Sequence, residues 1–169
     1  TTGFGRMAYS LLLPSMKTGL SLTYTETGLI GTANFTGYLL LALVGGFIAV
    51  RFGSRRTIFV SLMVMGASMF CTGLASSFAA ALSMRFITGM GNGAAVVPMM
   101  ALTASWFAAQ KRGLAAGIVT AGIGIGLSIG GLVLPFVVKE FGPDGWRYAW
   151  FLLGGIVFAF SFVCYAFLR

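Results

Sequence analysis

Hydrophobic residues run along this chain in long segments that are separated by short polar turns. The segments lie at about 1–16, 26–50, 57–75, 79–106, 113–138 and 148–168. Within them apolar residues fill successive positions instead of alternating, so they do not resemble the strands of a transmembrane barrel. A bilayer-spanning helix needs about 20 apolar residues. Because lipid offers the backbone no hydrogen bonds, the pattern predicts an all-α membrane protein, a bundle of six transmembrane helices.

The first segment differs from the others because it is short for a span. It is already under way at Thr1 and reaches only to about Met16. It also lacks the basic start and small-residue cleavage site of a signal peptide. We therefore expect the chain to be an excerpt of a longer protein, with its N-terminus trimmed.

Composition supports a membrane protein and excludes several other classes. The chain is 58% hydrophobic and 8% charged, whereas a soluble domain carries about 25% charged residues. Its net charge of +8 is concentrated in turns and at the C-terminus, not on a continuous face that would bind nucleic acid. The chain has no histidine, and Cys71 and Cys164 lie within apolar runs. We expect no metal, no cofactor and no nucleic-acid partner.

The basic residues divide unevenly between the two sets of turns. The turns after the second and fourth segments, together with the C-terminus, hold Arg51, Arg55, Arg56, Lys111, Arg112 and Arg169. The other set holds Lys17, Lys139 and Arg147 together with all the acidic residues, Glu26, Glu140 and Asp144. Because Lys and Arg accumulate in cytoplasmic turns, this asymmetry predicts a multi-pass protein of the cell (inner) membrane with a cytoplasmic N-terminus.

Local signals mark two of the helix boundaries. Thr23 and Glu26 have the spacing of a capping box at the start of the second helix. The residues Gly-Pro-Asp-Gly at 142–145 predict a turn before the last helix. Trp146, Tyr148 and Trp150 follow that turn, where aromatic residues of the membrane interface are expected.

Four motifs occur in order along the chain, three of them at the ends of segments and one inside the fourth segment. The turn after the second segment reads Gly46-x-x-x-Val50-Arg51-x-Gly53-x-Arg55-Arg56. The others are Arg85-x-x-x-Gly89-x-Gly91, Trp106-Phe107 with Lys111-Arg112-Gly113, and Gly145-Trp146-Arg147. Together they resemble the N-terminal six-helix half of the major facilitator superfamily over the whole chain. The family has an acidic residue where Val50 stands, so the charge network of that turn is altered here.

The resemblance implies one half of a 12-helix fold, with the C-terminal half absent from this chain. It also implies a secondary active transporter, not an enzyme, in which two halves rock about a central site. In the family the first turn motif acts as a conformational switch. The matching residues here are Gly46, Arg51, Gly53, Arg55 and Arg56. The stretches around Arg6 and Asn34 are similar to a bacterial branch and to the organic-anion and monocarboxylate carriers.

Charged residues inside a span are costly, so they are candidates for function. Only Arg6 and Arg85 lie inside the segments away from their ends. The resemblance implies that the central cavity is faced by Arg6, Tyr9, Asn34, Tyr38, Arg85 and Asn92. An arginine presents a planar fork to a carboxylate, and no acid lies deep in any span, so we expect a small organic anion such as a monocarboxylate. Arg6 could instead reach the interface, and Arg85 could hydrogen-bond to backbone carbonyls of a neighbouring helix.

The fifth segment carries a stripe of glycines at four-residue spacing, formed by Gly122, Gly126 and Gly130. Such stripes let helices approach closely. The resemblance implies that this helix packs against the other half and moves during transport. The expected partners are thus the anionic substrate, the lipid bilayer and the C-terminal six-helix half.

Other functions stay open at this stage. The chain could be a complete six-helix protein that dimerises as a channel or half-size carrier. It could also belong to a drug or neutral-solute transporter of the same superfamily, although the fifth segment lacks the family's antiporter Gly-Pro pair. A membrane enzyme is disfavoured by the lack of histidine and of intramembrane acids. The protein could also be a non-transporting receptor with a carrier fold, and flux measurements would distinguish it from a transporter.

Overall fold

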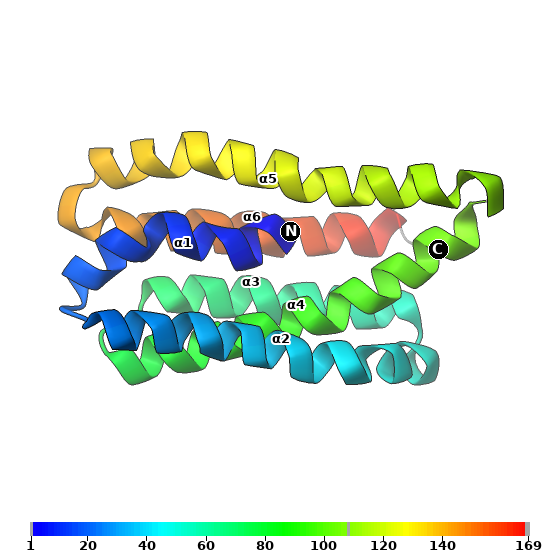
Figure 1. The fold of residues 1–169 in the computed structure, drawn as a ribbon, viewed down its shortest axis with the longest axis horizontal. Coiled ribbons are helices and arrows are strands. Elements are labelled where there is room, and N and C mark those ends of the chain that lie inside the picture. The colour runs from blue at the N-terminus through cyan, green and yellow to red at the C-terminus, as the bar shows by residue number, and fades with distance from the viewer. Residues whose placement is uncertain (1, 108, 168–169) are drawn as a thin grey trace.

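Long helices run side by side along one axis in the computed structural model (Figure 1). The structure describes residues 2–107 and 109–167, and of these the side chains of 2–8, 104, 109 and 112 are outside the description. The α-helices of the described chain are α1 (Thr2–Gly19), α2 (Tyr24–Phe52), α3 (Ser54–Gly73), α4 (Phe78–Trp106), α5 (Arg112–Glu140) and α6 (Gly145–Phe167). Short 3-10 helices, η1 (Ala109–Lys111) and η2 (Gly142–Asp144), precede α5 and α6. The predicted all-α fold class is confirmed.

The helices differ in how well they suit a bilayer. Within the described residues, 5 helices are long and apolar enough to cross a membrane, and these are α2 to α6. The first helix, α1, has 18 residues and is not among them. Arg6, Lys17 and several small polar residues lower its hydrophobicity. Length and composition therefore support five of the six expected spans.

The predicted capping box at the start of α2 is present. The backbone N–H of Glu26 donates to Thr23 Oγ1 over 3.2 Å, and the backbone N–H of Thr23 donates to Glu26 Oε2 over 2.8 Å. At its other end α2 meets α3 through Gly53 alone, with φ +87°. Because L side chains rarely adopt this backbone conformation, the tight reversal needs glycine.

The most extensive helix contacts join α2 to α4, α3 to α6 and α3 to α4, whereas α5 packs mainly against α1. The α2–α4 contact is close because glycines remove side chains from it. A Cβ at Gly89 would collide with the carbonyl oxygen of Asn34, and a Cβ at Gly93 would collide with that of Tyr38. The glycines of α4 thus bring its backbone close to that of α2.

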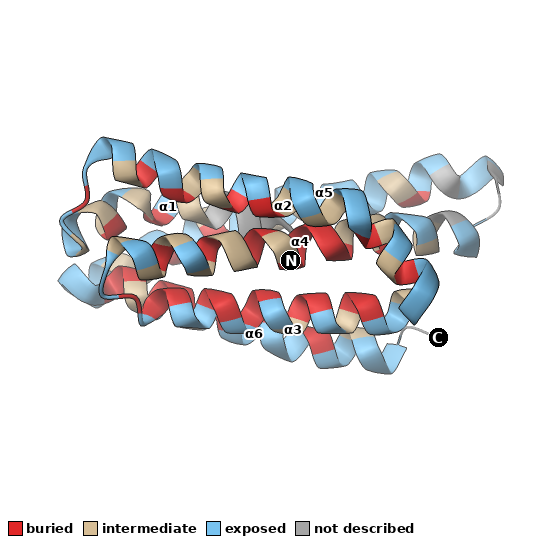
Figure 2. Cartoon of the chain, turned by 90° about the horizontal axis from the view of Figure 1, so that it is seen from below, coloured by how far each residue is buried: buried red, intermediate tan, exposed pale blue. Residues whose placement is uncertain are grey.

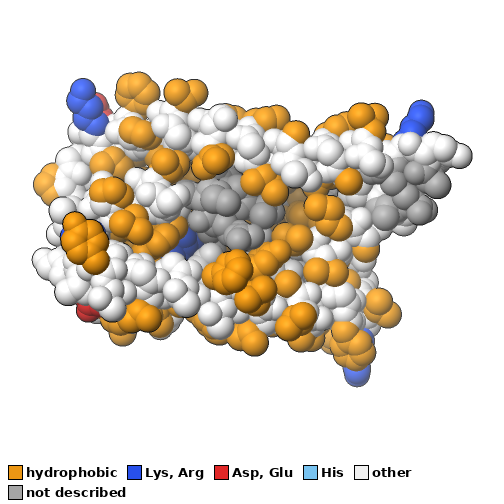
Figure 3. All heavy atoms as spheres, viewed as in Figure 1, with side chains coloured by type: hydrophobic (Ala, Val, Ile, Leu, Met, Phe, Trp, Pro, Cys, Tyr) orange, Lys and Arg blue, Asp and Glu red, His pale blue; other side chains and the backbone are white. Residues whose placement is uncertain are grey.

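The main core lies between α1, α3 and α6. Its largest fully buried side chains include Leu12, Met16, Met65, Trp146 and Trp150. Figure 2 shows buried residues following one face of α3, with exposed residues on the other. On the face seen in Figure 3, hydrophobic side chains cover the length of the bundle, as expected for contact with lipid.

Candidate functional site

Among the described residues, Arg85 is the charged residue whose side chain is fully buried, with an exposed fraction of 0%. It lies on α4, and its Cζ atom is 4.2 Å from the ring centroid of Trp150 on α6. None of its three guanidinium nitrogens has a hydrogen-bond partner among the described residues. The alternative that Arg85 bonds to backbone carbonyls of a neighbouring helix is therefore not seen there.

The negative charges of the chain all lie elsewhere. The sequence has 3 acidic residues. Glu26 is engaged in the cap of α2, Glu140 is exposed at the end of α5, and Asp144 forms an ion pair with Arg147 at 3.2 Å. The face of an indole attracts a guanidinium, but it does not neutralise it. This chain thus supplies no carboxylate for Arg85.

Two other predicted site residues use their polar groups to join helices. The Tyr9 hydroxyl donates to the carbonyl oxygen of Thr27 over 2.6 Å, which links α1 to α2. Asn34 Nδ2 donates to the backbone carbonyl oxygen of Arg85 over 2.8 Å, which links α2 to α4. Asn34 is 8% exposed. Both side chains thus use their polar groups for contacts between helices of this bundle.

The remaining predicted residues differ in their positions. Asn92 is 2% exposed, and its Nδ2 has no partner among the described residues. It lies on the same face of α4 as Arg85, two turns or about 10 Å further along. Tyr38 is half-buried, and its ring lies 6.3 Å from that of Phe35. The Arg6 side chain lies outside the described residues.

The positions of the α6 tryptophans correct the expectation that Trp146 and Trp150 are exposed aromatic residues of the membrane interface. Trp146 and Trp150 are fully buried, whereas Tyr148 between them is 47% exposed. Residues four apart share a helix face, so both tryptophans point into the core, and Trp150 Nε1 donates to Met16 Sδ over 3.1 Å. Their spacing, continued by Leu153 and Val157, is the sequence signal that would have identified a core face.

The arginines around the α2–α3 turn have different surroundings. Arg55 donates from Nε and Nη2 to the carbonyl oxygen of Tyr165, at 2.9 and 2.5 Å, and its Cζ lies 4.2 Å from the Tyr165 ring. Arg51 is exposed beside the Phe52 ring. Arg56 lines a groove between α2 and α3. Val50, at the family's acidic position, is 88% exposed.

The predicted glycine stripe of α5 has no packing partner over much of its length. A Cβ at Gly122 or Gly126 would meet no atom of the described chain within 4 Å. Gly130 is buried. Close packing at Gly122 and Gly126 is thus not seen among the described residues, and packing against a second half stays a prediction.

No group of three or more His, Cys, Asp or Glu side chains that could hold a metal ion occurs in the described part of the chain. What the arrangement offers is a positive charge and an amide on one face of α4, between helices that hold each other through hydrogen bonds.

Comparison with known proteins places this arrangement in a family. The family model of the Major Facilitator Superfamily matches residues 1–169. The chain is 28% identical to a probable sulfoacetate transporter of Cupriavidus necator, over 96% of the chain and 37% of the relative. It is 27% identical to a hexuronate transporter of Bacillus subtilis, over 88% of the chain and 34% of the relative.

A third relative is a 4-hydroxybenzoate transporter of Acinetobacter baylyi, 28% identical over 90% of the chain and 33% of the relative. The chain spans about a third of the length of these curated relatives. The match over the whole chain, the helical bundle and the ordered motifs agree: this chain belongs to the major facilitator superfamily, a family of multi-pass membrane transporters and not of enzymes.

Proposed function

We propose that the protein containing this chain is a secondary active transporter that moves a small organic anion, such as a monocarboxylate, by alternating access. The observation that carries this proposal is Arg85, a fully buried guanidinium for which the chain supplies no carboxylate. An anionic substrate would provide the missing charge. Sulfoacetate, hexuronate and 4-hydroxybenzoate, in the names of the relatives, are all carboxylates.

In this proposal Arg85 binds the carboxylate through paired, charge-assisted hydrogen bonds. Between transport events the Trp150 ring holds the guanidinium in place by a cation–π contact. The Asn92 amide on the same helix face offers a second polar contact to the body of the substrate. Arg6 on α1 is the other positively charged residue inside the apolar segments. It is proposed to face the central cavity together with Arg85.

The conformational change is proposed to involve two features of the chain, the glycine stripe of α5 and the basic turn between α2 and α3. The second six-helix half would pack on the glycine stripe of α5 and rock against this half. The turn at 46–56 would act as the switch, with its basic residues on the cytoplasmic side together with the N-terminus. Because no acid lies inside the spans of this chain, any coupling proton is bound in the other half or by the substrate.

Uptake by proteoliposomes that contain the full-length protein tests the proposal. A panel of radiolabelled carboxylates is supplied to wild type, Arg85→Lys and Arg85→Gln. Loss of a charged hydrogen-bond donor should lower kcat/KM about 10- to 100-fold in Arg85→Gln, and Arg85→Lys should lose less. Lys139→Gln removes an exposed positive charge at the end of α5 and should transport like wild type.

The same assay separates the alternatives. Unchanged uptake in Arg85→Gln would overturn the role of Arg85. Transport of neutral solutes or cationic drugs, with no carboxylate carried, would favour the corresponding branch of the superfamily. A channel would equilibrate the solute without concentrating it against its gradient, so accumulation driven by an ion gradient distinguishes a carrier from a dimeric channel.

A further inference from the structure

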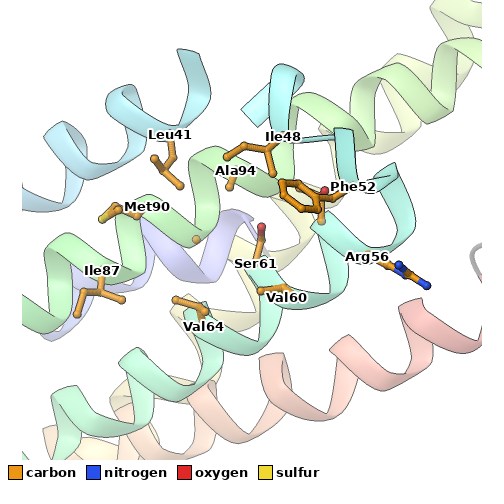
Figure 4. A pocket seen from close by; sticks show the side chains of 12 residues that line it. Leu41, Ile48, Phe52, Arg56, Val60, Ser61, Val64, Ile87, Met90 and Ala94 are labelled. Atoms are coloured by element: carbon orange, nitrogen blue, oxygen red, sulfur yellow. The ribbon is translucent and has the colours of Figure 1, made fainter. Parts of the chain in front are cut away.

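A groove of about 620 Å³ runs between α2 and α3, with α4 as its floor. Its walls are mostly aliphatic, and Figure 4 shows Leu41 and Ile48 on one side and Val60 and Val64 on the other. Val60 is 56% exposed and Val64 is 40% exposed. The groove is therefore open on the surface of the described bundle.

The length of the groove matches one leaflet of a membrane. Along α2 it extends from Leu41 to Phe52, which at 1.5 Å per residue is about 16 Å. Half of the hydrocarbon core of a bilayer is about 15 Å thick. Phe52 is the last residue of α2 and lies beside the charged turn, so this end of the groove is the one expected at the membrane interface.

One end of the groove carries a positive charge. Arg56 lies at the end opposite Ile87, and its guanidinium points away from the apolar walls (Figure 4). No hydrogen bond or ion pair joins Arg56 to another described residue, in contrast to Arg55, which is bound to the Tyr165 carbonyl. The charge of Arg56 is thus available to a ligand whose apolar part fills the groove.

We propose that this groove binds an anionic phospholipid, with one acyl chain between α2 and α3 and the phosphate on Arg56. The aliphatic walls match the acyl chain, the length matches one leaflet, and the guanidinium matches a phosphate at the interface. The binding does not rest on the proposed transport function, because it requires neither Arg85 nor a substrate.

Native mass spectrometry of the full-length protein, released from detergent with added palmitoyl-oleoyl phosphatidylglycerol, tests the proposal. Wild type should retain the lipid. Arg56→Gln should lower the bound fraction about fivefold, because one basic residue near the headgroup is lost. Val60→Trp should lower it about tenfold, because the indole occupies the space of several methylenes. Val64→Phe is a second groove-filling variant if Val60→Trp does not fold.

Matched controls make each effect specific. Arg51→Gln removes an arginine of the same turn that does not line the groove, and Val163→Trp adds an indole at an exposed position of α6. Both should retain the lipid like wild type. Glycerol 3-phosphate, a headgroup without chains, should not displace it.

Three results would overturn the proposal. Equal lipid retention by all variants would mean that the retained lipid does not lie in the groove, which could instead be covered by the second half of the transporter. Equal losses in Arg51→Gln and Arg56→Gln would indicate diffuse attraction to the turn. Displacement by glycerol 3-phosphate, with no effect of Val60→Trp, would show that the headgroup alone is bound.

Discussion

Two helices of this bundle are rich in glycine, and their glycines have opposite surroundings. On α4, Gly89 and Gly93 lie against backbone carbonyls of α2, with no room for a methyl group. On α5, Gly122 and Gly126 meet no atom of the described chain within 4 Å of a Cβ position. The same residue type therefore marks a completed helix contact in one place and an uncovered face in the other.

The difference lies in what accompanies the glycines. The α2–α4 contact also contains the hydrogen bond from Asn34 to the Arg85 carbonyl, so it combines close packing with a polar link. The α5 helix instead exposes large apolar side chains, among them Ile125 at 61% and Leu132 at 68%. A glycine stripe shows that a helix can be approached closely, whereas its neighbours show whether the approach occurs within the same chain.

Gly89→Ala should have the largest effect, because its methyl group would collide with the backbone of α2. Backbone cannot move aside as a flexible side chain does, so we expect the free energy of unfolding to fall by about 3 kcal/mol. The measurement is the thermal unfolding midpoint of the full-length protein in detergent. Gly28→Ala is the control, since this glycine of α2 has open space around its Cβ position. Equal midpoints for the two variants would show that α2 and α4 are not in close contact.

Asn34→Ala should have a moderate effect on the same contact. It removes the side-chain hydrogen bond between α2 and α4, which is worth about 1 kcal/mol inside a membrane protein. Thr32→Ala is the matched control, because the Thr32 hydroxyl donates to the Gly28 carbonyl of its own helix. The two variants are compared by thermal unfolding in detergent. If both shift the midpoint equally, the link from Asn34 to α4 does not stabilise the fold.

The sequence predicted those features that depend on short stretches of chain. The capping box of Thr23 and Glu26 follows from their spacing, and the helices follow from runs of apolar residues. The burial of Trp146 and Trp150 was missed because aromatic residues near the end of a span were assigned to the interface. Their four-residue spacing indicates a shared buried face, since residues four apart lie on the same side of a helix.

The candidate site could be predicted only in part. A charged residue inside a span is costly, so Arg85 was identified from the sequence as a candidate site residue. Its contact with Trp150 joins α4 to α6, and the engagement of Asn34 joins α2 to α4. Such contacts depend on how the helices are arranged, which local patterns do not specify. For the same reason the sequence could not tell that Gly122 and Gly126 of the stripe meet no neighbour among the described residues.

Gly122→Ala should have the smallest effect on stability and yet be informative about the uncovered face. The chain leaves room for the methyl group, so the free energy of unfolding of the full-length protein should change by less than about 0.5 kcal/mol. If the second half packs on the stripe in one state of the transport cycle, the methyl group disfavours that state. Carboxylate uptake by proteoliposomes should then fall about fivefold, which corresponds to about 1 kcal/mol.

Gly124→Ala is the control for this experiment, because Gly124 lies off the stripe and also has open space around its Cβ position. Uptake should be unaffected by this change. Equal uptake in both variants would show that no helix closes on the stripe. The glycines of α4 would then serve helix packing, whereas those of α5 would face lipid. A loss confined to Gly122→Ala would instead mean that both helices use glycine for close contact, α4 permanently and α5 only in part of the cycle.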